Sequence, residues 1–444
     1  MGWIALVGPE YEENLSLRYL ASSLTASGYR SEIIRFGSER DFPDVLRAIL
    51  LAPEPPLIVG VSLAFQWRAM EMMALAVALR EGGYAGHITV GGHFATFACS
   101  ELLRDFPDLD SVCRHESEET LVELAQALER GAPLQEVPGL ALRDANDEVS
   151  LTAFREPPDL HSLPPPDRRG PPRRCFGHPL APVISSRGCY AKCSFCCIAA
   201  WHEQTLPGKR YRLRRAGDVA DEMVAMQRAR GVEIFVFQDD NFFVPGRKHN
   251  LDKLNALADA LERRRIGRFG VIVKARPNDV DPEVFTTLRD RLHALRIYVG
   301  VETDSDQGLI TLARRLDSAQ NHRAIDTLRA LGLNASFNML IFDPDTTLRS
   351  FERNVAFMDK HADFSFNFCR TELYAGTPLL ARMLAEGRTR GDYFGYNYTL
   401  RTPEVQRVFE TSIKAFAPRN FGRGALHNDI GGWHLQLRAC RHFH

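Results

Sequence analysis

The chain lacks several features that mark nucleic-acid-binding, membrane and secreted proteins. Its 55 basic and 56 acidic residues leave a formal net charge of −1, which gives no reason to expect a nucleic-acid or membrane-surface partner. No segment approaches the ~20 apolar residues of a membrane span. The first residues, MGWIALVGPEYEE, lack the charged start of a secretory signal. We therefore expect a cytoplasmic protein in which disulfides do not form.

Strands and helices are predicted to alternate in two series along the 444 residues, which indicates an α/β protein. Residues 1–150 predict a doubly wound, Rossmann-like domain with a parallel sheet. Residues 151–182 predict an extended linker, because prolines are dense there and interrupt helices and central strands. Six strands, each followed by a helix, predict a partial (β/α)6 barrel over 183–390, with its chemistry at the C-terminal ends of the strands. Residues 391–444 show no clear period, and we expect a C-terminal cap.

Four of the nine cysteines lie within GCYAKCSFCC, residues 188–197. Cys189, Cys193 and Cys196 have the spacing C-x3-C-x2-C, and Cys197 follows directly. A structural zinc site usually takes four ligands in two separated pairs; no second pair lies nearby, although Cys197 or His202 could complete the set. Three thiolates also fit an iron–sulfur cluster that keeps one iron open. Taken alone, these residues leave zinc and an iron–sulfur cluster both open.

This cysteine spacing on a partial barrel resembles the radical SAM superfamily. The resemblance implies that Cys189, Cys193 and Cys196 bind a [4Fe-4S] cluster whose open iron takes S-adenosylmethionine (SAM). Reductive cleavage of SAM would give methionine and a 5′-deoxyadenosyl radical, which removes a hydrogen atom from the substrate. A flavodoxin or ferredoxin is expected as the electron donor. The matching motifs extend over residues 180–390, and Cys197 has no assigned role.

Further barrel motifs resemble the SAM-binding elements of this superfamily. FVFQDDNFF ends the second strand in polar groups, YVGVETDSDQGLITLARR resembles Gly-x-Glu-x-x-Ser with a downstream arginine, and ELYAGTPLLARMLAEG resembles the segment that closes the barrel. The implied SAM contacts are Phe195, Asn338 and Ile341 for the adenine, Gln238, Asp239 and Asp240 for the ammonium, Glu302 and Ser305 for the ribose, and Arg314 or Arg315 for the carboxylate. The alternatives are turn caps for Asp239 and Asp240, and surface positions for the arginines.

Residues 1–150 resemble the cobalamin-binding domain that one class of radical SAM enzymes carries. VGVSLAF and ITVGGHFAT fit its Ser-x-Leu and Gly-Gly elements, which implies that Ser62, Gly91 and Gly92 contact cobalamin. The alternative is an ordinary strand–helix turn. The loop that ligates cobalt through histidine in other B12 proteins is absent, since GPEYEENLSLRY contains no histidine. The domain therefore either binds cobalamin without a protein imidazole or keeps only the fold.

Two reactions on a small-molecule substrate fit these resemblances. The short chain and the incomplete cobalamin motif favour a dehydratase that deoxygenates an amino sugar in antibiotic biosynthesis. Tyr211 and Glu372 are its candidate catalytic residues, as a proton donor or as a ligand of substrate ammonium groups. The first alternative is a cobalamin-dependent methyltransferase that acts on an unactivated carbon. The second is a non-catalytic cobalamin or redox sensor, against which the complete set of SAM-binding motifs argues.

Overall fold

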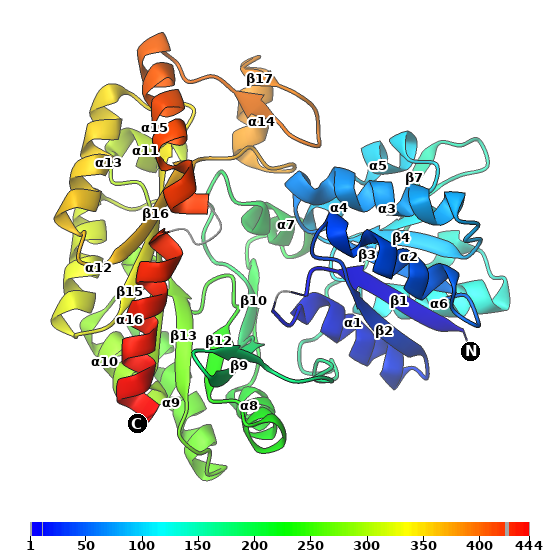
Figure 1. The fold of residues 1–444 in the computed structure, drawn as a ribbon, viewed down its shortest axis with the longest axis horizontal. Coiled ribbons are helices and arrows are strands. Elements are labelled where there is room, and N and C mark those ends of the chain that lie inside the picture. The colour runs from blue at the N-terminus through cyan, green and yellow to red at the C-terminus, as the bar shows by residue number, and fades with distance from the viewer. Residues whose placement is uncertain (1, 11, 422–425, 444) are drawn as a thin grey trace. The chain divides into compact units, whose positions relative to one another are not determined.

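The computed structural model describes residues 2–10, 12–421 and 426–443. The chain divides into two compact units, whose elements are labelled in Figure 1. The front domain comprises Met1–Gly170 with Tyr374–Gly376 and Gly391–Tyr396, and the barrel domain comprises the remainder. Within the described ranges, no helix combines the length and the apolar composition needed to cross a bilayer.

The front domain has one seven-stranded sheet with helices on both faces. Its strands are β1 (Trp3–Gly8), β2 (Arg30–Arg35), β3 (Ile58–Ser62), β4 (His87–Gly91), β5 (Ser111–Cys113), β6 (Leu140–Arg143) and β7 (Val149–Leu151). Its helices are α1 (Leu15–Ala26), α2 (Phe42–Leu50), α3 (Ala69–Glu81), α4 (His93–Phe97), α5 (Cys99–Asp105) and α6 (Glu118–Arg130). The order is β2-β1-β3-β4-β5-β6-β7. The first five strands are parallel and have the flavodoxin-like order, whereas β6 and β7 are antiparallel.

Two hydrophobic clusters cover the two faces of this sheet. Ile4 and Leu6 of β1 belong to the cluster that includes α1 and α6. Ala5 and Val7 belong to the cluster that includes residues of α2, α3, α4 and α5. Because side chains of a strand alternate between its faces, a parallel strand buried on both sides is apolar throughout. The structure confirms the predicted doubly wound arrangement.

The barrel domain is built on a second seven-stranded sheet. Its strands are β8 (Arg173–Cys175), β9 (His178–Val183), β12 (Ile234–Phe237), β13 (Gly270–Ala275), β14 (Ala294–Glu302), β15 (Ala335–Phe342) and β16 (Ser365–Arg370). The order is β16-β15-β14-β13-β12-β9-β8. All strands from β9 to β16 in this sheet pair in parallel, and only β8 is antiparallel. This curled sheet confirms the predicted partial (β/α)6 barrel.

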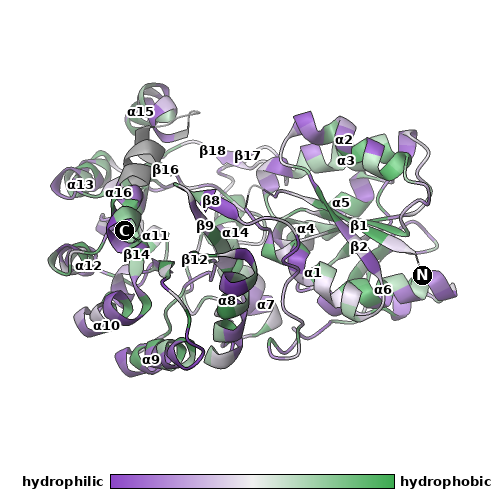
Figure 2. Ribbon diagram, turned by 60° about the horizontal axis from the view of Figure 1, so that its bottom comes forward, coloured by the Kyte–Doolittle hydropathy of each residue, from purple (hydrophilic) through white to green (hydrophobic). Residues whose placement is uncertain are grey.

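Helices surround the barrel sheet, and two short strand pairs lie outside it. The helices are α7 (Cys197–Thr205), α8 (Ala216–Arg230), α9 (Arg247–Arg263), α10 (Pro282–Leu292), α11 (Asp306–Thr311), α12 (Ser318–Ala330), α13 (Leu348–Lys360), α14 (Pro378–Ala385), α15 (Pro403–Phe421) and α16 (Leu426–Phe443). The strand pairs are β10 (Ser186–Gly188) with β11 (Tyr211–Leu213), and β17 (Thr389–Arg390) with β18 (Asn397–Tyr398). Figure 2 shows that these helices carry both hydrophilic and hydrophobic residues, as expected for helices with one buried face.

Two segments differ from the sequence expectation. The predicted linker contains β8 and the start of β9, so regular structure begins before residue 183. The C-terminal segment forms two long helices, α15 and α16. Of the described α16 side chains only Leu435 and Ala439 are buried, and Leu435 packs with Ile234, Ile272 and Leu295 of the barrel strands. Phe443 packs against the same cluster.

Candidate active site

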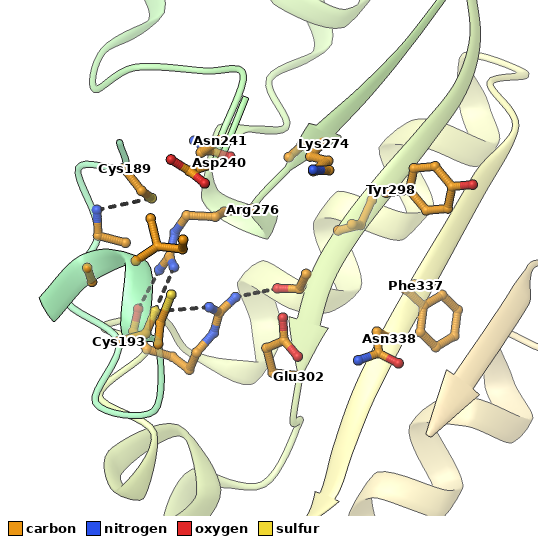
Figure 3. Close-up of a pocket in the computed structure, with 18 of the residues that line it drawn as sticks. Cys189, Cys193, Asp240, Asn241, Lys274, Arg276, Tyr298, Glu302, Phe337 and Asn338 are labelled. Atoms are coloured by element: carbon orange, nitrogen blue, oxygen red, sulfur yellow. Dashed lines mark hydrogen bonds between the residues drawn. The ribbon is translucent and has the colours of Figure 1, made fainter. Parts of the chain in front are cut away.

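A cavity of about 490 Å³ lies in the barrel domain (Figure 3). Its walls come from the cysteine loop, from the residues after β12 and from β13, β14, β15 and β16. Parallel strands of a barrel bring residues at their C-terminal ends together, and this arrangement accounts for a site assembled from distant parts of the sequence.

The predicted cluster ligands Cys189, Cys193 and Cys196, hereafter the cluster cysteines, all line this cavity. Burial raises the pKa of Cys189 to about 11. It also raises the pKa of Cys196, where the thiols of Cys197, Cys193 and Cys189 act in the same direction. The thiols therefore lie near one another in a site that disfavours isolated thiolates.

The cluster cysteines bring three thiols to one wall of the cavity. Within the described ranges, no group of three or more His, Cys, Asp or Glu side chains is arranged to hold a single metal ion. In a [4Fe-4S] cluster each thiolate binds a different iron, so three thiols on one loop fit a cluster with one open iron.

Backbone hydrogen bonds tie the cysteine loop to the barrel. The Ser194 N–H donates to Leu312 O at 3.1 Å, and the Leu379 N–H donates to Ser194 O at 2.8 Å. The Gly188 N–H donates to Asp240 Oδ2 at 2.8 Å. Asp240 itself lines the cavity. The same carboxylate thus anchors the loop and contributes to the cavity wall.

The two acidic residues after β12 have different roles. Asp239 is 1% exposed and accepts hydrogen bonds from the Ser185 N–H, the Ser185 hydroxyl and the Ser186 hydroxyl. The prediction that Asp239 contacts SAM is therefore corrected: it braces the start of the cysteine loop. Gln238 Oε1 accepts a hydrogen bond from Lys274 Nζ at 3.0 Å, and Gln238 does not line the cavity.

Glu302, at the end of β14, lines the cavity with a carboxylate that has no partner among the described residues. No described residue donates a hydrogen bond to it or forms an ion pair with it, although burial raises its pKa while Arg314 and Arg276 lower it. The backbone of Glu302 has φ +67°, an uncommon conformation. A Cβ at Gly300 would lie 2.9 Å from Glu302 Oε1, so glycine leaves room for this orientation. Such a carboxylate fits ribose hydroxyls as hydrogen-bond donors.

Phe195, Asn338 and Arg314 also line the cavity. Arg314 is 3% exposed. Its Nη1 donates to Cys193 Sγ at 3.2 Å, and its Nη2 donates to Gly300 O. Its buried Nε has no hydrogen-bond partner. The Arg314 guanidinium in this wall is a cation that fits the carboxylate of SAM.

Five further predicted site residues lie outside the cavity lining. Ser305 caps α11 by accepting the Gly308 N–H at 3.0 Å, Arg315 is exposed, and Ile341 is 1% exposed in the core. Tyr211 pairs with Gly188 in the β10–β11 hairpin, and Glu372 is exposed. The cavity gives these five predictions no support, and they stay predictions.

Sequence reasoning missed several polar residues of the lining. Lys274 lies near the end of β13 and Arg276 directly follows that strand, whereas Asn241, Tyr298 and Asn367 come from neighbouring elements. The sequence pattern that could have indicated these residues is KARPND, which spans the C-terminal end of the third barrel strand and the turn after it. Barrel enzymes carry functional residues at this end of their strands. Lys274 forms no ion pair with any described carboxylate and donates only to the neutral Gln238 amide.

Ser62, Gly91 and Gly92 lie together at the C-terminal edge of the front-domain sheet. Ser62 pairs with Gly91 in the parallel β3–β4 register. Gly92 has φ +117°, and a Cβ there would lie 2.9 Å from the Leu63 backbone. At the end of β3, Phe65 is 51% and Trp67 67% exposed. A close backbone turn beside exposed aromatic rings fits a large, flat cofactor such as cobalamin.

Two protein families match the two domains. Residues 4–125 match the B12 binding domain family. Residues 183–358 match the radical SAM superfamily. The two matches cover the predicted cobalamin residues and all of the residues predicted to bind the cluster and SAM.

Similar proteins have been found by sequence and by structure. An uncharacterized methyltransferase of Pyrococcus horikoshii is 26% identical over 377 residues, covering 82% of this chain and 77% of the relative. Hopanoid C-3 methylase of Methylococcus capsulatus is 30% identical over 353 residues, covering 77% of this chain and 63% of the relative. The structure of OxsB, a cobalamin-dependent SAM radical enzyme with aqua-cobalamin and SAM bound, has a TM-score of 0.75 at 18% identity, covering 100% of this chain and 72% of that one. At this identity the structural likeness shows the fold alone.

Proposed function

Because the chain belongs to the radical SAM superfamily and carries a B12-binding domain, we propose that it is a cobalamin-dependent methyltransferase acting on an unactivated carbon of a small molecule. The observation that carries this proposal is the presence in one chain of the cysteine-lined cavity and the B12-binding domain. Two relatives whose similarity extends over 82% and 77% of the chain are named as a methyltransferase and a methylase. Those names support methyl transfer as the reaction class.

The residues of the cavity have separable tasks in this proposal. When bound, the cluster supplies one electron to SAM, and cobalamin supplies a carrier for the methyl group. Asp240 holds the SAM ammonium, Glu302 accepts hydrogen bonds from the ribose hydroxyls, and the Arg314 guanidinium pairs with the carboxylate. Phe195 forms an apolar wall beside the adenine and helps exclude water. A flavodoxin or ferredoxin supplies the electron.

Deoxygenation of an amino sugar, the reaction favoured by the sequence, has less support. Tyr211 and Glu372 do not line the cavity. The cavity carboxylates Asp240 and Glu302 are both assigned to SAM, which leaves none for a substrate ammonium. The Lys274 ammonium would also repel a cationic sugar at this position. Methyl transfer therefore takes the place of deoxygenation as the main proposal.

The fate of SAM tests the proposal without knowledge of the substrate. The protein is purified and reconstituted without oxygen, once with cobalamin and once without it, and is then incubated with SAM and a reductant. Methyl transfer predicts S-adenosylhomocysteine in the cobalamin-loaded sample and much less in the sample without cobalamin. Equal formation of 5′-deoxyadenosine in both samples, with no S-adenosylhomocysteine in either, would contradict the proposal and return attention to deoxygenation.

A further inference from the structure

Two buried arginines converge on a single cluster cysteine. Arg276 Nη1 donates to Cys193 Sγ at 3.1 Å, and Arg314 Nη1 donates to the same sulfur at 3.2 Å. Figure 3 shows the Arg276 side chain directed at Cys193. We propose that this arginine pair tunes the reduction potential of the cluster through Cys193. The inference rests on the cluster alone and holds whichever reaction follows SAM cleavage.

The three cluster cysteines differ in this respect. The Cys189 sulfur accepts the Ala191 backbone N–H at 3.4 Å, a neutral donor. Within the described ranges, only the Cys193 sulfur accepts hydrogen bonds from charged side chains. Cys193 is 5%, Arg276 8% and Arg314 3% exposed. At such depth, solvent screens the two positive charges far less than it would at the surface.

A network of hydrogen bonds holds Arg276 in one orientation. Its backbone N–H donates to Asp279 Oδ2 at 2.9 Å, and its Nη2 donates to Arg314 O at 2.7 Å. Asp279 in turn accepts the Tyr190 hydroxyl at 2.5 Å and Asn241 Nδ2 at 3.0 Å. Tyr190 lies beside Cys189 in the sequence. The network therefore ties the Arg276 backbone to the cysteine loop, and the Nη2 bond to Arg314 O orients the guanidinium against the sulfur.

The direction of the effect follows from charge. One-electron reduction makes the cluster more negative, and hydrogen bonds from cations to a ligating sulfur stabilise that extra charge. The arginine pair should thus raise the potential and ease reduction by the electron donor. Replacing Arg276 by methionine should disfavour reduction about tenfold, which corresponds to ~59 mV for a one-electron couple.

The test is potentiometry of the reconstituted protein, followed by electron paramagnetic resonance of the reduced cluster in the absence of SAM. The variants are Arg276→Met and Arg276→Lys, and Lys192→Met is the matched control. Lys192 carries the same charge next to Cys193 in the sequence, but its side chain is exposed. We expect the potential to fall in Arg276→Met, to fall less in Arg276→Lys and to stay unchanged in Lys192→Met.

Three results would overturn the proposal. The first is a wild-type potential in Arg276→Met. The second is a shift in Lys192→Met as large as that in Arg276→Met, since net charge would then explain the effect. If Arg276→Met fails to hold a cluster, Arg276→Lys and Arg276→Gln are measured instead. The third refuting result is then a wild-type potential in both of these variants.

Discussion

Replacing Glu302 by glutamine tests the proposed SAM site at a carboxylate that has no hydrogen-bond or ion-pair partner among the described residues. The amide keeps the shape of the side chain but loses the charge, so ribose hydroxyls would donate to a weaker acceptor. Hydrogen bonds to charged groups contribute ~1.5–3 kcal/mol, and each 1.4 kcal/mol changes a dissociation constant about tenfold. The amide oxygen still accepts hydrogen bonds, at the ~0.5–1.5 kcal/mol of a neutral pair, so the Kd for SAM should rise about tenfold. Cluster content should stay unchanged, because Glu302 is not a cluster ligand.

The assay is anaerobic equilibrium dialysis with the cluster-loaded protein. Ser305→Ala is the matched control, because sequence reasoning assigned both residues to the ribose while the structure makes Ser305 a helix cap. That variant should lose about 1 kcal/mol of stability and keep its SAM affinity. Burial raises the pKa of Glu302, so wild-type affinity should also weaken as the pH falls through this raised pKa, and the glutamine variant should lack that dependence. An unchanged Kd in Glu302→Gln, or an equal loss in Ser305→Ala, would refute the reasoning.

Further variants test other parts of the account. Alanine at any cluster cysteine should abolish the iron–sulfur absorption and SAM cleavage, whereas Cys197→Ala should keep both; a cluster that survives loss of a cluster cysteine would contradict the ligand set. Asp239→Ala should lower stability by ~3 kcal/mol, since it leaves buried donors unpaired, and an unchanged thermal midpoint would argue against the brace. Asp345 binds Arg382, Arg388 and Arg401, and hydrogen bonds from these arginines offset burial and lower its pKa. Asp345→Asn should destabilise the protein near neutral pH and progressively less in acid, because a depressed pKa stabilises the fold only while the carboxylate stays ionised; a pH-independent difference in thermal midpoint would refute this.

The fold was predictable because its signals are local. Apolar runs and amphipathic segments alternate, and each run predicts its own strand or helix. The site was predictable only where its residues lie in contiguous motifs, as the cluster cysteines do. Arg276 was missed because its partners, Cys193 and Arg314, are distant in the sequence and meet it only in three dimensions.

The roles of neighbouring residues were harder to predict from the sequence. Asp239 and Asp240 are adjacent, yet Asp239 accepts hydrogen bonds from the two serines whereas Asp240 lines the cavity. The role of Ser305 was equally hard to predict, because a serine that caps a helix and a serine that binds a ribose can occur in the same sequence pattern. Helix α16 was missed because the last fifty residues show no clear apolar period in the sequence.

The metal content of the reconstituted protein tests the central claim most directly. The protein would be purified without oxygen from cells supplied with cobalamin, and iron and cobalt would be measured per chain. The account predicts about four irons in one cluster and about one cobalt. Full iron with no cobalt would mean that the front domain has kept its fold without its cofactor, and the proposed methyl transfer would then be wrong.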